Sequence, residues 1–174
     1  MKEMGARTTF GVCSFCAALV FAGCQGIDQT ISGFNTAAVD RLESHTWDTV
    51  SRLHSFQGIY LASQPQPKGF KRAKKAGVKT VINLRHEEEV KAFNERELVS
   101  SQGLIYISLP WNGVDQLNDT VFERTRELLN SAQRPILLHC SSGNRVGAVW
   151  LPWRVLDGKA TYEEALTEAK AIGL

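Results

Sequence analysis

Residues 135–145, Pro135-Ile136-Leu137-Leu138-His139-Cys140-Ser141-Ser142-Gly143-Asn144-Arg145, decide the fold of this chain. They open with an apolar run that is typical of a buried strand, and residues 146–151 then form an apolar run of helical character. A strand, a tight turn and a helix N-terminus together form an anion cradle, because free backbone N–H groups and the helix dipole point into the turn. The stretch therefore predicts an anion site at the end of a strand.

Cys140 and Arg145 place a nucleophile and a cation in that cradle. A thiol at a helix N-terminus beside a cation ionises readily, with pKa values of roughly 3.5–7.5 against about 8.5 for free cysteine. We expect Arg145 to fold back over the loop and offer its planar fork to a tetrahedral oxyanion. These are the groups needed to attack a phosphate ester at phosphorus. The alternative, an inert buried thiol, fits the polar sequence after Cys140 poorly.

The pattern His-Cys-x5-Arg, present here as residues 139–145, resembles the signature loop of cysteine-based protein tyrosine and dual-specificity phosphatases. Residues 60–65 and 76–85 also look like the compact bacterial branch of that family, and the resemblance covers about residues 59 to 172. It implies a phosphomonoester hydrolase that works through a phosphocysteine intermediate, without a cofactor or a metal. The phosphate-binding residues that it implies are Ser141, Ser142, Gly143, Asn144, Arg145 and Val146.

Two positions of this motif, His139 and Val146, are less clearly explained by the family pattern. His139 is implied by the resemblance to order the loop through a hydrogen bond, whereas from the residues alone it is equally an ordinary histidine at a strand end. Val146 departs from the family pattern, because many members carry serine or threonine there to assist hydrolysis of the phosphocysteine. Valine has no hydroxyl, so we expect a slower second step unless Ser141 or Ser142 substitutes.

The leaving group also needs a proton, a contribution commonly worth about 10²–10⁴-fold. In the family, an aspartate on a mobile loop upstream of the cysteine supplies it, and the matching loop here is residues 110–119. Asp115 is the first candidate, since it lies mid-loop near Gly113, a possible hinge. Asp119 is the second, although helix capping explains it well, and a third possibility is that no aspartate of this loop serves. Trp111 is either a pocket wall or a core residue.

Strands that alternate with helices predict an α/β fold, with a central, mainly parallel sheet flanked by helices on both faces. Ligands in such sheets bind beyond the carboxyl ends of the strands. A basic helix, residues 68–75, is interpreted as a solvated face in preference to a phosphate-binding patch. The predicted strands are 58–62, 80–84, 104–109 and 136–139. A further helix is predicted over 87–101, and another begins at a cap formed by Asp119 or Thr120, with Thr120 and Glu123 as a capping box. The last helix begins at a capping box formed by Thr161 and Glu164.

Length and composition are those of an ordinary folded domain. The chain has 174 residues, of which 43% are hydrophobic and 22% charged, enough for one domain with a real core. A net charge of +2 gives no drive toward nucleic acid. We therefore expect a monomer without a nucleic-acid partner.

The first 24 residues predict an export signal. Basic residues precede a short apolar run, 10–21, which is below the roughly 18 residues of a spanning helix. Residues 21–24, Phe-Ala-Gly-Cys, resemble the lipobox of bacterial lipoproteins, so we expect a periplasmic protein anchored to the membrane through lipidated Cys24. Cleavage without lipidation and a buried N-terminal helix are the alternatives. With Cys24 lipidated, the mature chain keeps one free thiol, Cys140.

The rest of the chain divides in two. Residues 25–57 read as a polar tether, 25–36, followed by a helix with apolar spacing over 37–53. Residues 58–174 are the expected phosphatase domain, which stops soon after its last helix.

Two other functions compete with phosphate ester hydrolysis. A rhodanese-like sulfurtransferase would form a persulfide on the loop cysteine, and a non-catalytic lipoprotein would keep the loop for binding. A substrate is either a phosphorylated protein or a small phosphomonoester. A polyphosphorylated lipid is disfavoured because the loop interior has no lysine.

Overall fold

The sheet is mixed, with strand order β1-β2-β3-β6-β4-β5 in the computed structural model, which describes residues 41–174. Strands β3, β6, β4 and β5 are parallel, and β2 and β1 extend one edge in antiparallel fashion. Strand β6, which ends directly before Cys140, lies between β3 and β4, and all its residues are buried. The elements are β1 Glu43–Ser44, β2 Leu53–Phe56, β3 Ile59–Ala62, α1 Pro67–Lys75, β4 Thr80–Asn83, the 3-10 turn Glu87–Glu89, α2 Glu95–Ser101, β5 Ile105–Ser108, α3 Asp119–Ser131, β6 Ile136–His139, α4 Asn144–Leu156 and α5 Tyr162–Ile172.

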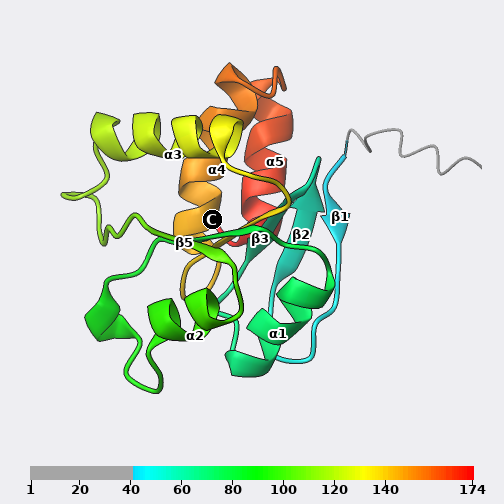
Figure 1. The fold of residues 1–174 in the computed structure, drawn as a ribbon. Coiled ribbons are helices and arrows are strands. Elements are labelled where there is room, and N and C mark those ends of the chain that lie inside the picture. The colour runs from blue at the N-terminus through cyan, green and yellow to red at the C-terminus, as the bar shows by residue number, and fades with distance from the viewer. Residues whose placement is uncertain (1–40) are drawn as a thin grey trace, which may run out of the picture. The chain divides into compact units, whose positions relative to one another are not determined.

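Helices cover both faces of this sheet. Figure 1 shows α1 and α2 on one face and α3, α4 and α5 on the other. Successive residues of β6 point to opposite faces, so Leu137 joins the core with Phe70 of α1, while Leu138 joins the core with Val149 of α4. The predicted fold, a mainly parallel sheet with helices on both faces, is confirmed.

The parallel strands place three loops at one edge of the sheet. The backbone N–H of Leu84, just after β4, donates to His139 at the end of β6 at 3.0 Å. Leu109, just after β5, donates to Asn83 at the end of β4 at 2.9 Å. The segments that follow β4, β5 and β6 are therefore neighbours, and the candidate site lies among them.

The predicted helix over 37–53 is wrong in its described part. Trp47 and Val50 form an antiparallel bridge, with the N–H of Val50 donating to the Trp47 carbonyl at 2.8 Å. Their three-residue spacing thus comes from a tight turn. Because β1 and β2 also belong to the sheet, the sheet begins before residue 58, where we expected the domain to start.

Residues 1–40 lie outside the described part of the chain, and with them the predicted signal, Cys24 and the tether. Within residues 41–174, no helix has the length and apolar character to cross a membrane.

The predicted helix over 87–101 is interrupted. Its first residues form the 3-10 turn Glu87–Glu89, and α2 starts afresh at Glu95. Asn94 caps this second start, because its side-chain oxygen accepts the N–H of Glu97 at 3.1 Å. The break frees the side chain of Glu89 to turn back toward the site.

The two predicted caps had different outcomes. Asn118 caps α3 by accepting the N–H of Val121 at 3.2 Å, so Asp119 lies in the first turn and the predicted Thr120–Glu123 box is wrong. The helix begins one residue earlier than predicted, because the side chain of Asn118 supplies the capping oxygen. The Thr161–Glu164 capping box of α5 is confirmed.

Candidate active site

Residues 140–146, hereafter the nucleophile loop, join β6 to α4. Cys140 is 1% exposed, and its sulfur accepts the N–H of Gly143 at 3.2 Å. Gly143, at φ 100°, is the N-cap of α4 and turns the chain so that consecutive N–H groups face inward. Within residues 41–174, no backbone acceptor binds the N–H of Ser141, Ser142, Asn144, Arg145 or Val146.

The carbonyls of this loop are bound from outside. The N–H of Gln64 donates to the Ser141 carbonyl at 3.0 Å. Arg52 Nη1 donates to the Ser142 carbonyl at 2.7 Å. Because the oxygens are engaged on the outer side, the N–H groups are left for an anion on the inner side.

The last turn of α5 packs against the nucleophile loop at Gly143. A Cβ built on Gly143 would lie 2.2 Å from the carbonyl oxygen of Ile172. One built on Gly173 would lie 3.0 Å from the carbonyl carbon of Gly143. The loop and α5 thus touch backbone to backbone, which leaves no room for side chains between them.

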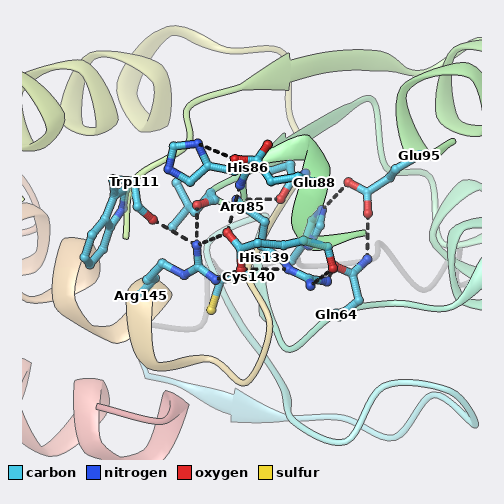
Figure 2. Close-up of polar contacts among 12 residues, drawn as sticks. Gln64, Arg85, His86, Glu88, Glu95, Trp111, His139, Cys140 and Arg145 are labelled. Carbon is cyan, nitrogen blue, oxygen red and sulfur yellow. Dashed lines mark hydrogen bonds and ion pairs between the residues drawn. The ribbon is translucent and has the colours of Figure 1, made fainter. Parts of the chain in front are cut away.

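Arg145 extends from the first turn of α4 and is clamped along one edge (Figure 2). Its Nη1 donates to the carbonyls of Leu84 at 3.1 Å and Trp111 at 2.9 Å. Nη1 and Nη2 also bind the two carboxylate oxygens of Glu89 at 2.7 and 2.5 Å. These bonds to oxygen come from Nη1 and Nη2, and the guanidinium also interacts with the Cys140 side chain. The Glu89 hydrogen bond raises the pKa of Arg145, and nearby Cys140 adds to the rise.

Glu89 is a site residue that our sequence reasoning missed. The hydrogen bond from Arg145 lowers its pKa from 4.5 to about 2, against the opposing effect of burial, and the N–H of His86 assists. Arg85 Nη2 holds the Glu89 backbone carbonyl at 2.5 Å, and its Nη1 binds Gln64 Oε1 at 2.5 Å. The signal was present as Arg-x3-Glu directly after the β4 strand.

A second buried carboxylate lies behind the nucleophile loop. Glu95 Oε1 is 3.0 Å from His139 Nε2, with both side chains almost fully buried and the ring not aligned for a linear hydrogen bond. Burial raises the pKa of Glu95, but the charge of His139 and hydrogen bonds from Gln64 and Tyr106 outweigh it, so the pKa lies below its usual range. His139 thus faces an ionised carboxylate in the chain position next to Cys140. Figure 2 shows Gln64 between Glu95 and Arg85.

The loop that carries the candidate acids is attached at its start. Trp111 is 4% exposed and belongs to the main core, and its carbonyl binds Arg145. The side chain of Gln116 folds back on the loop, and its Oε1 accepts the backbone N–H of Asn112 at 2.8 Å. Asp115 and Asp119 are exposed, and neither carboxylate has a hydrogen bond or ion pair within residues 41–174. The tip, where Gly113 has φ 73°, is closed by backbone hydrogen bonds from Gln116 to Gly113 and from Leu117 to Val114, and His86 Nε2 lies 3.0 Å from Gln116 Oε1.

Val146 is fully buried beneath the loop and packs in the main core. The position after the arginine therefore contributes no hydroxyl to the site. Within residues 41–174, no three histidine, cysteine, aspartate or glutamate side chains gather in a way that could hold a metal ion.

Residues 55–154 match the family described as beta-lactamase hydrolase-like protein, phosphatase-like domain. This chain belongs to that family. None of the curated proteins compared with the chain matches it. The predicted resemblance to cysteine-based phosphatases of the tyrosine and dual-specificity type is confirmed, and a sulfurtransferase is not favoured.

Solved structures show the same fold. TpbA of P. aeruginosa, as a cysteine-to-serine variant in complex with pTyr, is 20% identical with a TM-score of 0.63, over 80% of this chain and 83% of that one. The Siw14 catalytic core is 17% identical with a TM-score of 0.60, over 76% and 79%. A putative phosphatase of Neisseria meningitidis is 21% identical with a TM-score of 0.57, over 67% and 84%.

Proposed function

We propose that this protein hydrolyses phosphomonoesters through a phosphocysteine on Cys140. The sulfur attacks phosphorus, the ester P–O bond breaks, and the leaving oxygen takes a proton; water then attacks the phosphocysteine and releases phosphate. One observation carries the proposal: the buried Cys140 sulfur accepts the Gly143 N–H in a loop whose other N–H groups have no backbone acceptor, and it interacts with the guanidinium of Arg145. These donors match the equatorial oxygens of a transferring phosphoryl group.

We assign the proton to Asp115 and keep Asp119 as the alternative. An acid must approach the leaving oxygen when substrate is bound and leave when product departs. Support comes from the exposed position of Asp115 at the tip of a loop whose start binds Arg145. Asp119 is fixed in the first turn of α3, which limits its reach.

For the substrate class, we propose a phosphorylated protein, with a small phosphomonoester as the second candidate. TpbA, a protein of the same fold, binds pTyr in its complex. The loop interior of this chain has no lysine that would hold additional phosphates.

Hydrolysis of p-nitrophenyl phosphate by the full chain, with and without vanadate, tests this function. We expect vanadate-sensitive activity that Cys140→Ser lowers at least about a thousandfold without changing the circular dichroism spectrum. A variant within tenfold of wild type would refute the nucleophile. Sulfur transfer from thiosulfate to cyanide would indicate the sulfurtransferase instead, and inactivity in both assays a non-catalytic role.

We further propose export and lipidation of Cys24, which rests on the sequence of residues 1–24. Mass spectrometry of the mature N-terminus tests it directly. The expected result is a diacylglyceryl-modified Cys24 in the membrane fraction, and release of the protein to the soluble fraction in Cys24→Ser.

A further inference from the structure

A basic hollow lies between α1 and residues 46–49. Its volume is about 460 Å³. Four cations of α1 line one wall, and Trp47 and Asp48 lie on the other. The cations, hereafter the α1 stripe, are Lys68, Lys71, Arg72 and Lys75.

The α1 stripe is one face of the helix, because its members are spaced i, i+3, i+4 and i+7. All four side chains are exposed, and no carboxylate within residues 41–174 lies in ion-pair distance of any of them, Asp48 included. Like charges at these spacings repel one another along a helix. The stripe therefore carries an uncompensated positive field, focused by the hollow that it lines.

The helix dipole explains the positions of two of the four cations in the α1 stripe. Arg72 and Lys75 lie in the last turn, where the helix dipole favours cations. Lys68 directly follows Pro67, the first helical residue, and lies at the positive end of the dipole, where a cation is unfavourable. The interpretation of this helix as a solvated face leaves Lys68 unexplained, and an anionic partner explains it.

Both walls of the hollow are joined to the nucleophile loop by short stretches of chain. Gln64, whose N–H binds the Ser141 carbonyl, leads through Pro65 and Gln66 into α1. Residues 46–49 lead through Val50 and Ser51 to Arg52, which binds the Ser142 carbonyl. A substrate chain that runs from the nucleophile loop toward the N-terminus of α1 would therefore reach the hollow.

We propose that the basic hollow binds an acidic segment of a phosphoprotein substrate, next to the phosphorylated residue in the nucleophile loop. This rests on the proposed phosphatase function. Seven residues of helix span about 10 Å, the reach of about three extended residues, so acidic side chains at alternate positions can meet several of the cations. The carboxylate of Asp48, on the opposite wall, is able to accept backbone N–H groups of an extended segment. A flat lipid surface would not fill this concave site, so a peptide is the better occupant.

The test uses the full chain and two phosphotyrosine peptides that differ in flanking residues. One peptide carries glutamates on both sides of the phosphotyrosine, and its partner carries glutamines. We expect wild type to favour the acidic peptide about tenfold in kcat/KM and to lose this preference at high salt. Lys68→Gln/Lys71→Gln should abolish the preference, and the matched control Lys74→Gln/Lys79→Gln, with the same charge loss outside the hollow, should keep it. Both double variants should hydrolyse p-nitrophenyl phosphate within twofold of wild type.

Equal kcat/KM for the two peptides in wild type overturns the proposal, as does an equal loss of preference in both double variants. Fluorescence anisotropy of the same labelled peptides with Cys140→Ser measures docking without turnover, so a failed phosphatase proposal is distinguished from failed docking. Sedimentation with phosphatidylglycerol vesicles gives the last outcome. If Lys68→Gln/Lys71→Gln weakens vesicle binding and the peptides are not discriminated, the hollow faces a membrane and the peptide proposal is wrong.

Discussion

The nucleophile loop and the loop between β5 and α3 have equivalent positions at the carboxyl edge of the sheet, yet they are restrained very differently. The first is bound by Arg52 and Gln64 from outside and by α5 from below. The second is bound at its start through the carbonyl of Trp111, and its exposed tip is held by hydrogen bonds within the loop and by the contact of Gln116 with His86. The first loop is thus fixed by several other parts of the molecule, and the second mainly by its own residues.

This difference matches the two chemical tasks of the proposed reaction. Phosphate binding gains most from donors that are already oriented, since preorganised dipoles need no rearrangement in the transition state. Proton delivery has to allow substrate entry and product release. Mutations in the rigid loop should therefore affect every substrate, and mutations in the exposed loop should depend on the leaving group.

Arg145→Lys is the most severe test of the nucleophile loop. Lysine cannot reproduce the bidentate fork, so kcat should fall by about 10²–10³ for all esters. Inhibition by vanadate should weaken in parallel, as measured in steady-state assays with p-nitrophenyl phosphate. Normal vanadate affinity would show that Arg145 does not bind the oxyanion.

Asp115→Asn tests the loop between β5 and α3. Hydrolysis of phosphotyrosine should slow by about 10²-fold, whereas p-nitrophenyl phosphate, whose phenolate leaves more easily, should be affected much less. The basic limb of the pH–rate profile should flatten, because the titrating acid is removed.

Asp119→Asn is the matched control and should behave like wild type. If it shows the leaving-group dependence instead, the acid is Asp119. If neither variant shows it, the acid lies outside this loop.

Glu89→Gln tests how much the fixed position of Arg145 matters, because it removes the carboxylate that binds Nη1 and Nη2 of Arg145. We expect kcat to fall by about tenfold, since a bidentate charged pair is lost. Glu89 has a folded pKa lowered from 4.5 to about 2, so its stabilising effect is present above pH 4.5 and is lost as the pH falls toward 2. Thermal unfolding should show a deficit of roughly 2 kcal/mol at pH 7 that narrows below pH 4.5. Glu88→Gln, at a neighbouring side chain that is 80% exposed, should change neither quantity.

Val146→Ser should give the smallest effect. A hydroxyl at this position can assist release of the sulfur, so hydrolysis of the phosphocysteine should accelerate a few-fold if that step limits turnover. Burst kinetics with p-nitrophenyl phosphate measure it, and a smaller burst with faster steady state is the expected result. An unchanged burst would mean that the second step is not slowed by valine.

The parts of the molecule that were predictable from sequence are those with local signals. The β6 strand, the turn at Gly143 and the start of α4 follow from a contiguous stretch of apolar and polar residues. The alternation of strands and helices likewise followed from periodicity. These features depend on residues that are neighbours in the chain.

The features that escaped prediction depend on contacts between distant segments. Glu89 is a surface-like residue in sequence, and it becomes a site residue because Arg145, far along the chain, reaches it. Glu95 carries no local sign of the buried pair that it forms with His139. Trp47 and Val50 imitate a helical period because a turn has the same spacing. In each case tertiary packing overrode the local pattern.

The contact between Gly143 and Gly173 has a consequence for how this enzyme can change. Both positions have positive φ, and on either one a Cβ would approach the backbone of the other segment to 3.3 Å or less. A change at one cannot be compensated at the other, because a glycine has no side chain left to shrink. In a saturation library selected for any substrate at all, both sites should remain glycine while the exposed loop from Gly113 to Asp115 diversifies. The substrate range of this scaffold can thus change through the exposed loop, while Gly143 in the nucleophile loop and Gly173, which packs against it, cannot be substituted.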